Sequence, residues 1–138
     1  MSKDEGAVAL LGFAGWTAAH AALVVGARVG AVLAGKKKAN EFTKSRDGGE
    51  ATFIARVGKS HANCLENLPL FAAVVLVNKA FGGASLGALP SYYLAARIAQ
   101  SLVHWSGVSE IQVNARFAFF VIQGALLALM GKTTFEAL

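Results

Sequence analysis

The chain has 138 residues, the length of a single domain, and 55% of them are hydrophobic while only 15% are charged. Soluble proteins carry roughly 25% charged residues, so this composition and a mean hydropathy of +0.51 exclude an ordinary soluble domain and indicate an integral membrane protein. The net charge is +5, and five of the 13 lysines and arginines gather in one short polar segment together with three acidic residues. The chain has no helix-turn-helix pattern or zinc spacing, which argues against nucleic acid as a partner.

The first expected element is an apolar run over residues 6–35, interrupted only by Trp16, Thr17, His20 and Arg28. About 20 residues suffice to cross a bilayer, so this run is long enough for a complete span. It is too long for a secretory signal and lacks a basic leader, so we expect a retained first span. His20, towards the outer half of this span and away from the cluster of polar residues described below, is expected to be a hydrogen-bonded interior residue and not a ligand.

A polar linker follows at residues 36–52, with a turn signal at Asp47-Gly48-Gly49. The second apolar run contains Pro69, which predicts a kink, and the third has Pro90 near its start, as first-turn prolines do. The expected fold is all-α: an integral membrane four-helix bundle in one domain over 1–138, with spans at about 6–35, 53–81, 86–105 and 113–131.

The orientation in the membrane follows from the distribution of lysine and arginine. The 36–52 linker carries five of these cations, whereas the opposite loop and the terminal segments carry few. The positive-inside rule therefore places this linker in the cytoplasm and both termini on the other side. We expect a multi-pass protein of a bacterial inner membrane, because the loops are compact.

Polar side chains gather on the second span. Arg56, Lys59, Asn63 and Glu66 are spaced at i, i+3, i+7 and i+10, which forms one stripe on a helix. Charged groups inside a membrane must face other helices or a water-filled cavity, and they indicate a functional site. An ion-pair network that only fixes helix register remains an alternative. With the predicted orientation, further polar groups converge at the same depth: Arg28, Gln100, His104 and Arg116.

These residue types suit a zwitterionic peptide as ligand. Arginine and lysine bind carboxylates, a lone glutamate accepts an ammonium group, and a nearby guanidinium favours a thiolate over a thiol. Glutathione carries two carboxylates, one amine, peptide amides and a thiol, although other zwitterionic peptides share most of these groups. The matching side chains are Arg28, Arg56, Lys59, Asn63, Glu66, Arg97 and Gln100.

The segment KSHANCLENLPLF at residues 59–71 resembles the second-helix signature of the MAPEG family, the membrane-associated proteins in eicosanoid and glutathione metabolism. That signature reads basic-x-(His/Gln)-x-Asn-x-x-Glu-x-x-Pro. Arg97 and His104 are similar to the third-helix pattern of the family. Arg28 and Arg116 match family arginines of the first and fourth helices. The resemblance extends over about residues 6–130.

The resemblance implies a left-handed four-helix bundle assembled as a homotrimer, with a glutathione site between adjacent subunits that faces the cytoplasm. In this interpretation Arg116 is the catalytic residue, since it stabilises the thiolate, and His61 braces the polar network. Gln100 and His104 stand where tyrosines often contact glutathione. The remaining glutathione-binding residues would be Arg28, Arg56, Lys59, Asn63, Glu66 and Arg97.

The resemblance therefore predicts a membrane-bound glutathione transferase or peroxidase that acts on lipophilic electrophiles or lipid hydroperoxides, with glutathione as co-substrate and no metal. Lys59 replaces the usual arginine, and the tyrosines of the third helix are missing, so a non-catalytic lipid-binding or scaffold protein of the same fold is the alternative. A small drug exporter needs a membrane carboxylate for proton coupling, and the first span has none.

Other side chains have structural interpretations. The single cysteine, Cys64, excludes an internal disulfide and is expected to be a small buried residue. Ser106 and Ser109, in the third loop, could donate a hydrogen bond to a thiolate. Four aromatic residues are expected at the membrane interfaces: Trp16, Trp105, Tyr92 and Tyr93. Three more are expected to face lipid or neighbouring helices, or to line a substrate groove: Phe117, Phe119 and Phe120.

Overall fold

A computed structural model of the chain describes residues 4–43 and 52–138. Over these residues the protein is entirely helical, as predicted, and has no strand. The predicted turn at 47–49 lies outside the described residues. The helices are α1 (Glu5–Leu33), the short 3-10 helix η1 (Ala39–Thr43), α2 (Phe53–Ala80), α3 (Leu89–Ser106) and α4 (Glu110–Phe135).

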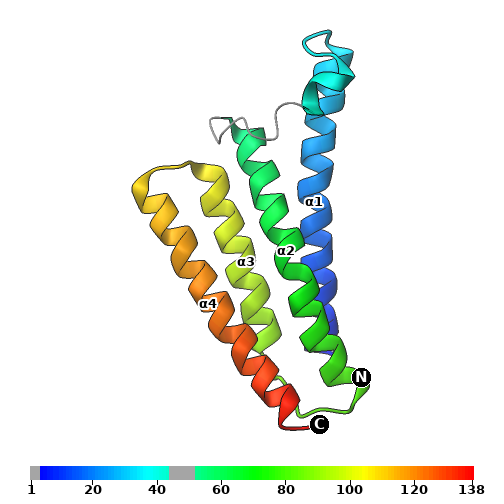
Figure 1. The fold of residues 1–138 in the computed structure, drawn as a ribbon, viewed down its shortest axis with the longest axis vertical. Coiled ribbons are helices and arrows are strands. Elements are labelled where there is room, and N and C mark those ends of the chain that lie inside the picture. The colour runs from blue at the N-terminus through cyan, green and yellow to red at the C-terminus, as the bar shows by residue number, and fades with distance from the viewer. Residues whose placement is uncertain (1–3, 44–51) are drawn as a thin grey trace.

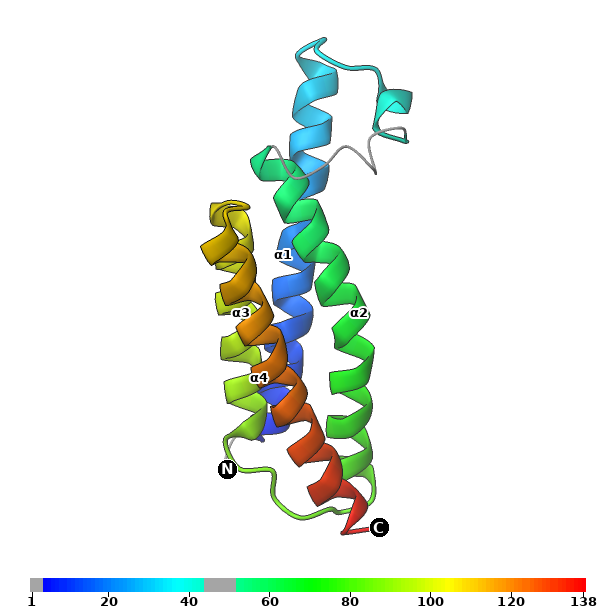
Figure 2. The ribbon, with the colours of Figure 1, turned by 60° about the vertical axis from the view of Figure 1, so that its left-hand side comes forward.

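The long helices lie side by side as an elongated bundle (Figure 1). α1 packs against α2 and α3, whereas α4 packs against α3 and α2 and makes no contact with α1 within the described residues. Both ends of the chain lie at one end of the bundle, and the last turns of α1 project beyond the other helices at the opposite end (Figure 2). The buried residues of α1 stop at His20, and the residues of its second half are half-buried or exposed.

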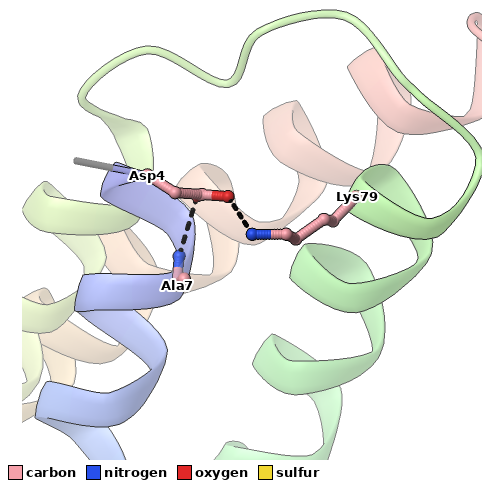
Figure 3. A network of polar contacts seen from close by, with 3 residues as sticks. All are labelled: Asp4, Ala7 and Lys79. Atoms are coloured by element: carbon pink, nitrogen blue, oxygen red, sulfur yellow. Dashed lines mark hydrogen bonds and ion pairs between the residues drawn. The ribbon is translucent and has the colours of Figure 1, made fainter. Parts of the chain in front are cut away.

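Side-chain caps explain where the helices begin. The Asp4 carboxylate accepts a hydrogen bond from the Ala7 backbone N–H at 3.0 Å and also binds the Lys79 ammonium group at 2.5 Å, which ties the start of α1 to the end of α2 (Figure 3). Ser109 and Gln112 form a capping box, so α4 begins at Glu110, three residues earlier than predicted. The hydroxyl of Ser109 is therefore engaged in the cap.

Three of the described helices, α1, α2 and α4, are long and apolar enough to cross a membrane. α3 is 18 residues long, which corresponds to about 27 Å, close to the thickness of the hydrocarbon core. It falls short in apolar character because it carries several polar residues, of which four are buried inside the bundle: Arg97, Gln100, Ser101 and His104. Three spans rather than four are thus recognisable by composition, and they support a multi-pass membrane protein.

An aromatic cluster forms the core. The rings of Phe71 and Tyr93 stack with centroids 4.5 Å apart, and the Phe13 ring lies about 6 Å from both. Tyr93 is only 1% exposed, so its predicted interfacial position is wrong, whereas its neighbour Tyr92 is 61% exposed. Cys64 is fully buried, as predicted.

Candidate functional site

A cavity of about 260 Å³ lies between α2, α3 and α4. Five of the ten side chains that the sequence predicted for the site line it, so the structure brings half of that set together. The lining residues are Asn63, Glu66 and Asn67 from α2, Arg97 and Gln100 from α3, and Val113, Arg116, Phe117 and Phe120 from α4.

Arg97 is the most buried charged group at this cavity. Its side chain is 1% exposed, and its Cζ lies 5.7 Å from the centroid of the Phe13 ring. Its Nε and Nη2 atoms are buried and have no hydrogen-bond partner within the described residues. Buried donors on a charged group are costly when unpaired, so this guanidinium is prepared for an anionic acceptor in the cavity.

The α2 wall of the cavity is polar. Asn63, Glu66 and Asn67 are spaced at i, i+3 and i+4, which places them on one face of the helix. The Asn67 side-chain nitrogen donates to the Asn63 backbone oxygen at 2.8 Å. Sequence reasoning gave Asn67 no role, and its spacing from Asn63 was the available signal. Together these groups offer one carboxylate and two amides to a ligand.

Two glutamine side chains form a hydrogen-bonded chain that holds the backbone of α4 in position at Arg116. Gln100 Nε2 donates to the Arg116 backbone oxygen at 2.9 Å, and Gln123 Nε2 donates to Gln100 Oε1 at 3.1 Å and to the Phe119 backbone oxygen at 3.0 Å. Gln123 is only 2% exposed. Sequence reasoning missed Gln123, although a glutamine in an otherwise apolar span was a visible signal.

The α4 wall of the cavity is apolar apart from Arg116. Val113, Phe117 and Phe120 are spaced at i, i+4 and i+7 and are 43%, 66% and 53% exposed. The same apolar stripe therefore forms part of the cavity wall and part of the outer surface of the bundle. Phe117 and Phe120 follow the predicted possibility of a substrate groove, whereas Val113 was missed. The cavity is amphipathic and can hold a polar ligand beside an apolar one.

The other five predicted residues do not line this cavity, and two of them lie near the loop end of the bundle. Arg28 is exposed on the projecting half of α1, about 12 Å along the helix axis beyond His20, the last buried residue of α1. Arg56 is half-buried, and its Nε donates to the Trp105 backbone oxygen at 2.9 Å, which links α2 to the end of α3.

The remaining three predicted residues are Lys59, His61 and His104. Lys59 is exposed one turn before Asn63, and His104 is buried on α3. His61 is half-buried, with its ring centroid 6.4 Å from that of His20. The predicted single stripe on α2 is thus divided, because only its later part, Asn63 and Glu66, lines the cavity.

His20 lies in a second polar cluster, between α1, α2 and α3. It is fully buried, with Nδ1 2.8 Å from the Trp16 backbone oxygen and Nε2 2.9 Å from Ser60 Oγ. A carbonyl oxygen can only accept, so Nδ1 carries the proton and Nε2 accepts from Ser60. The ring also packs edge-on against Trp16 and Trp105. The predicted hydrogen-bonded interior position is confirmed, and His20 does not line the cavity.

The same cluster includes the stacked rings of Trp16 and Trp105, whose centroids are 5.4 Å apart. Trp16 Nε1 donates to Ser101 Oγ at 3.1 Å, so this tryptophan connects α1 to α3 and does not serve only as an interfacial anchor. In the part of the chain that the structure describes, no three histidine, cysteine, aspartate or glutamate side chains gather as metal ligands would.

Comparison with known proteins gives the family. A search of curated proteins and a search of solved structures each gave no match. The family model described as MAPEG family matches residues 6–135, which is nearly the whole chain. This match extends over α1, α2, α3 and α4 and over every residue that lines the cavity. The chain belongs to the MAPEG family.

Proposed function

We propose that the protein is a membrane-bound glutathione transferase or peroxidase, which binds glutathione in the cavity between α2, α3 and α4. The single observation that carries this proposal is Arg97, a fully buried guanidinium at the cavity with two nitrogen atoms that lack partners in the described chain. A carboxylate of glutathione would satisfy both donors, because guanidinium and carboxylate match in geometry as well as in charge.

The other polar groups of the cavity complement the rest of the ligand. Glu66 is a carboxylate that can accept the ammonium group of glutathione, and the amides of Asn63, Asn67 and Gln100 can bind its peptide groups. Arg116 is a second cation on the opposite wall. A cation near a thiol favours the thiolate, so Arg116 is the residue proposed to stabilise the nucleophile.

The proposed chemistry begins with this thiolate. In the transferase reaction its sulfur forms a bond to an electrophilic carbon, and a leaving group departs with the bonding electrons. In the peroxidase reaction the sulfur attacks the hydroperoxide, the O–O bond breaks and the alcohol leaves after protonation. A second glutathione thiolate then attacks the oxidised sulfur, which gives glutathione disulfide and water.

The apolar wall supports a substrate that arrives from the bilayer. Phe117 and Phe120 are more than half exposed on α4, one of the helices able to cross a membrane. A lipophilic molecule dissolved in the membrane can reach the cavity along this stripe without passing through water. The proposed second substrate is therefore a hydrophobic electrophile or a lipid hydroperoxide.

The proposal includes assembly as a homotrimer, with glutathione between adjacent subunits on the cytoplasmic side of a bacterial inner membrane. In support of this assembly, the projecting half of α1 carries exposed apolar residues and the exposed Arg28. In the trimer, Arg28 of one subunit would approach the cavity of its neighbour. The lysines at 36–38, directly after α1, agree with a cytoplasmic position of this end.

The decisive experiment measures glutathione binding to the detergent-purified protein by calorimetry, together with the ultraviolet absorbance of the thiolate across pH. Wild-type protein is expected to bind glutathione saturably and to lower the pKa of its thiol by a unit or more. Arg116→Ala is expected to keep binding but lose this pKa shift. Lys132→Leu, which removes an exposed cation at the far end of α4, serves as the control.

Binding without a pKa shift in the wild-type protein would contradict catalysis and favour a non-catalytic member of the family. If glutathione does not bind at all while a fatty acid raises the unfolding temperature, the proposed function is wrong and the lipid-binding scaffold replaces it.

A further inference from the structure

A second cavity lies between α2 and α4, towards the end of the bundle where both chain ends lie (Figure 1). Its volume is about 250 Å³, and it shares no lining residue with the candidate glutathione site. We call it the terminal groove. It is lined by Ala73, Val74 and Val77 from α2 and by Gly131, Thr134, Phe135 and Leu138 from α4 and the residues after it.

Thr134 is the one polar side chain among the residues that line the terminal groove. It is 5% exposed, and its hydroxyl oxygen is buried with no hydrogen-bond partner in the described residues. The adjacent Thr133 differs, because its hydroxyl donates to the Leu129 backbone oxygen at 3.0 Å. Helical threonines commonly satisfy themselves in this way. The Thr134 hydroxyl is therefore available for an acceptor that belongs to another molecule.

Gly131 keeps the terminal groove open. A Cβ atom built at this position would meet no atom within 4 Å, so a larger side chain fits without a clash. Gly131 lies three residues before Thr134, on the same face of α4. The space that a side chain at 131 would fill is thus continuous with the space beside the Thr134 hydroxyl.

Charged residues mark the polar boundary at this end of the bundle. Lys132 and Glu136 form an exposed ion pair at 3.6 Å next to Thr134, and Asp4 and Lys79 pair at the ends of α1 and α2 (Figure 3). Exposed charges at the ends of spans lie among the lipid headgroups. The Thr134 hydroxyl therefore lies near the boundary between headgroups and acyl chains, where the ester groups of lipids are found.

We propose that the terminal groove binds one acyl chain of an ester-linked membrane lipid, whose carbonyl oxygen accepts a hydrogen bond from the Thr134 hydroxyl. The apolar lining suits a hydrocarbon chain, and the single donor lies where the chain meets its ester. The inference is independent of glutathione binding, since the two sites have no residue in common.

The test uses a phosphatidylcholine with a photoactivatable acyl chain, reconstituted with the full-length protein in nanodiscs, and peptide mapping of the crosslinks. Wild-type protein is expected to crosslink within residues 73–77 and 131–138. Unlabelled diester phosphatidylcholine should compete about threefold or more better than the dialkyl ether analogue, because only the ester has a carbonyl acceptor. Thr134→Val should abolish this difference, whereas the matched control Thr133→Val should retain it.

Gly131→Leu fills the terminal groove and is expected to suppress crosslinking by both lipid types, with its fold verified by the unfolding temperature. Equal crosslinking in wild type and Gly131→Leu would overturn the proposal, because it would mean nonspecific contact with bulk lipid. Equal competition by ester and ether lipids in the wild-type protein would refute the hydrogen bond to Thr134. Absence of lipid crosslinks at these residues in the wild-type protein, together with a changed oligomeric state of Gly131→Leu, would assign the groove to a subunit contact instead.

Discussion

Two polar residues inside the bundle, His20 and Arg97, have similar burial but opposite states of hydrogen bonding. Both ring nitrogens of His20 are bonded, and Trp16 and Ser101 extend this network, in which the Nε1 atom of Trp105 is buried without a partner in the described residues. At the cavity, by contrast, Arg97 is equally buried and carries a charge, and two of its nitrogens have no partner in the described chain. A bonded neutral side chain holds helices together, whereas an unsatisfied charge beside a cavity is a candidate for ligand binding. Burial of a polar residue alone therefore does not distinguish structure from function.

The largest expected effect is that of Arg97→Leu on ligand binding. Loss of a buried charge pair costs about 2–5 kcal/mol, so the glutathione dissociation constant should rise roughly 30-fold or more. The stability of the ligand-free protein should change by less than about 1 kcal/mol, since the lost contact with Phe13 is offset by removal of a desolvated charge. Calorimetry and thermal unfolding in detergent measure the two quantities. Intact binding with reduced stability would make Arg97 structural.

The second prediction is the reverse result for His20→Leu. The substitution leaves the buried Ser60 hydroxyl without its acceptor and removes ring packing against Trp16 and Trp105. The free energy of unfolding is expected to fall by about 1–3 kcal/mol. The folded protein should bind glutathione as the wild type does. A rise in the glutathione dissociation constant without loss of stability would place His20 in the functional site and break the comparison.

Gln123→Leu should produce a smaller, mixed effect, because the Gln123 side-chain nitrogen is bonded and acts on the cavity through Gln100. Loss of its two hydrogen bonds is partly offset by removal of the buried, unpaired Oε1 atom and should cost about 1 kcal/mol of stability. The shift of Arg116 should lower kcat severalfold, with little change in KM for glutathione. Thr133→Val, which removes one hydrogen-bonded hydroxyl near the C-terminal end of α4, far from Arg116, is the matched control. Equal changes in kcat for both variants would show that Gln123 is only structural.

The helices were predicted well from the sequence, because the ends of the apolar runs coincide with the proline and glycine signals for helix ends. Pro90 lies in the first turn of α3, and α2 ends just before Gly82. The main error on α3 was the position predicted for Tyr93. Tyr93 is spaced at i, i+4 and i+7 with Arg97 and Gln100, so in a membrane helix it shares the polar, inward face. The aromatic character of Tyr93 suggested an interfacial position, but this periodicity determines its burial.

Part of the candidate site was predictable because its residues share a helix. Asn63 and Glu66 were found together because three residues make almost one helical turn, a relationship within one segment. Predicted residues on the other helices came from their common depth in the membrane and from the family resemblance, and three of them also line the cavity. Gln123 was missed because its importance comes from Gln100, which lies on another helix. Arg28 matched the family motif, but it lies on the projecting half of α1 and does not line the cavity.

The smallest expected effect concerns the ion pair of Asp4 and Lys79 (Figure 3). Both charges have a partner, but unlike His20 both side chains are exposed. The hydrogen bond from Lys79, with help from the Ala7 N–H, lowers the pKa of Asp4 below its ordinary value. A lowered pKa stabilises the folded state at pH values above the unfolded pKa, roughly 4, and this stabilisation is lost as pH falls through the folded pKa.

Asp4→Asn retains the helix cap and removes the charge. The wild-type protein should therefore unfold at a slightly higher temperature than Asp4→Asn at pH 6, with the difference vanishing near pH 2 and shrinking in high salt. A difference that persists at pH 2 would show that the cap, and not the charge, is responsible.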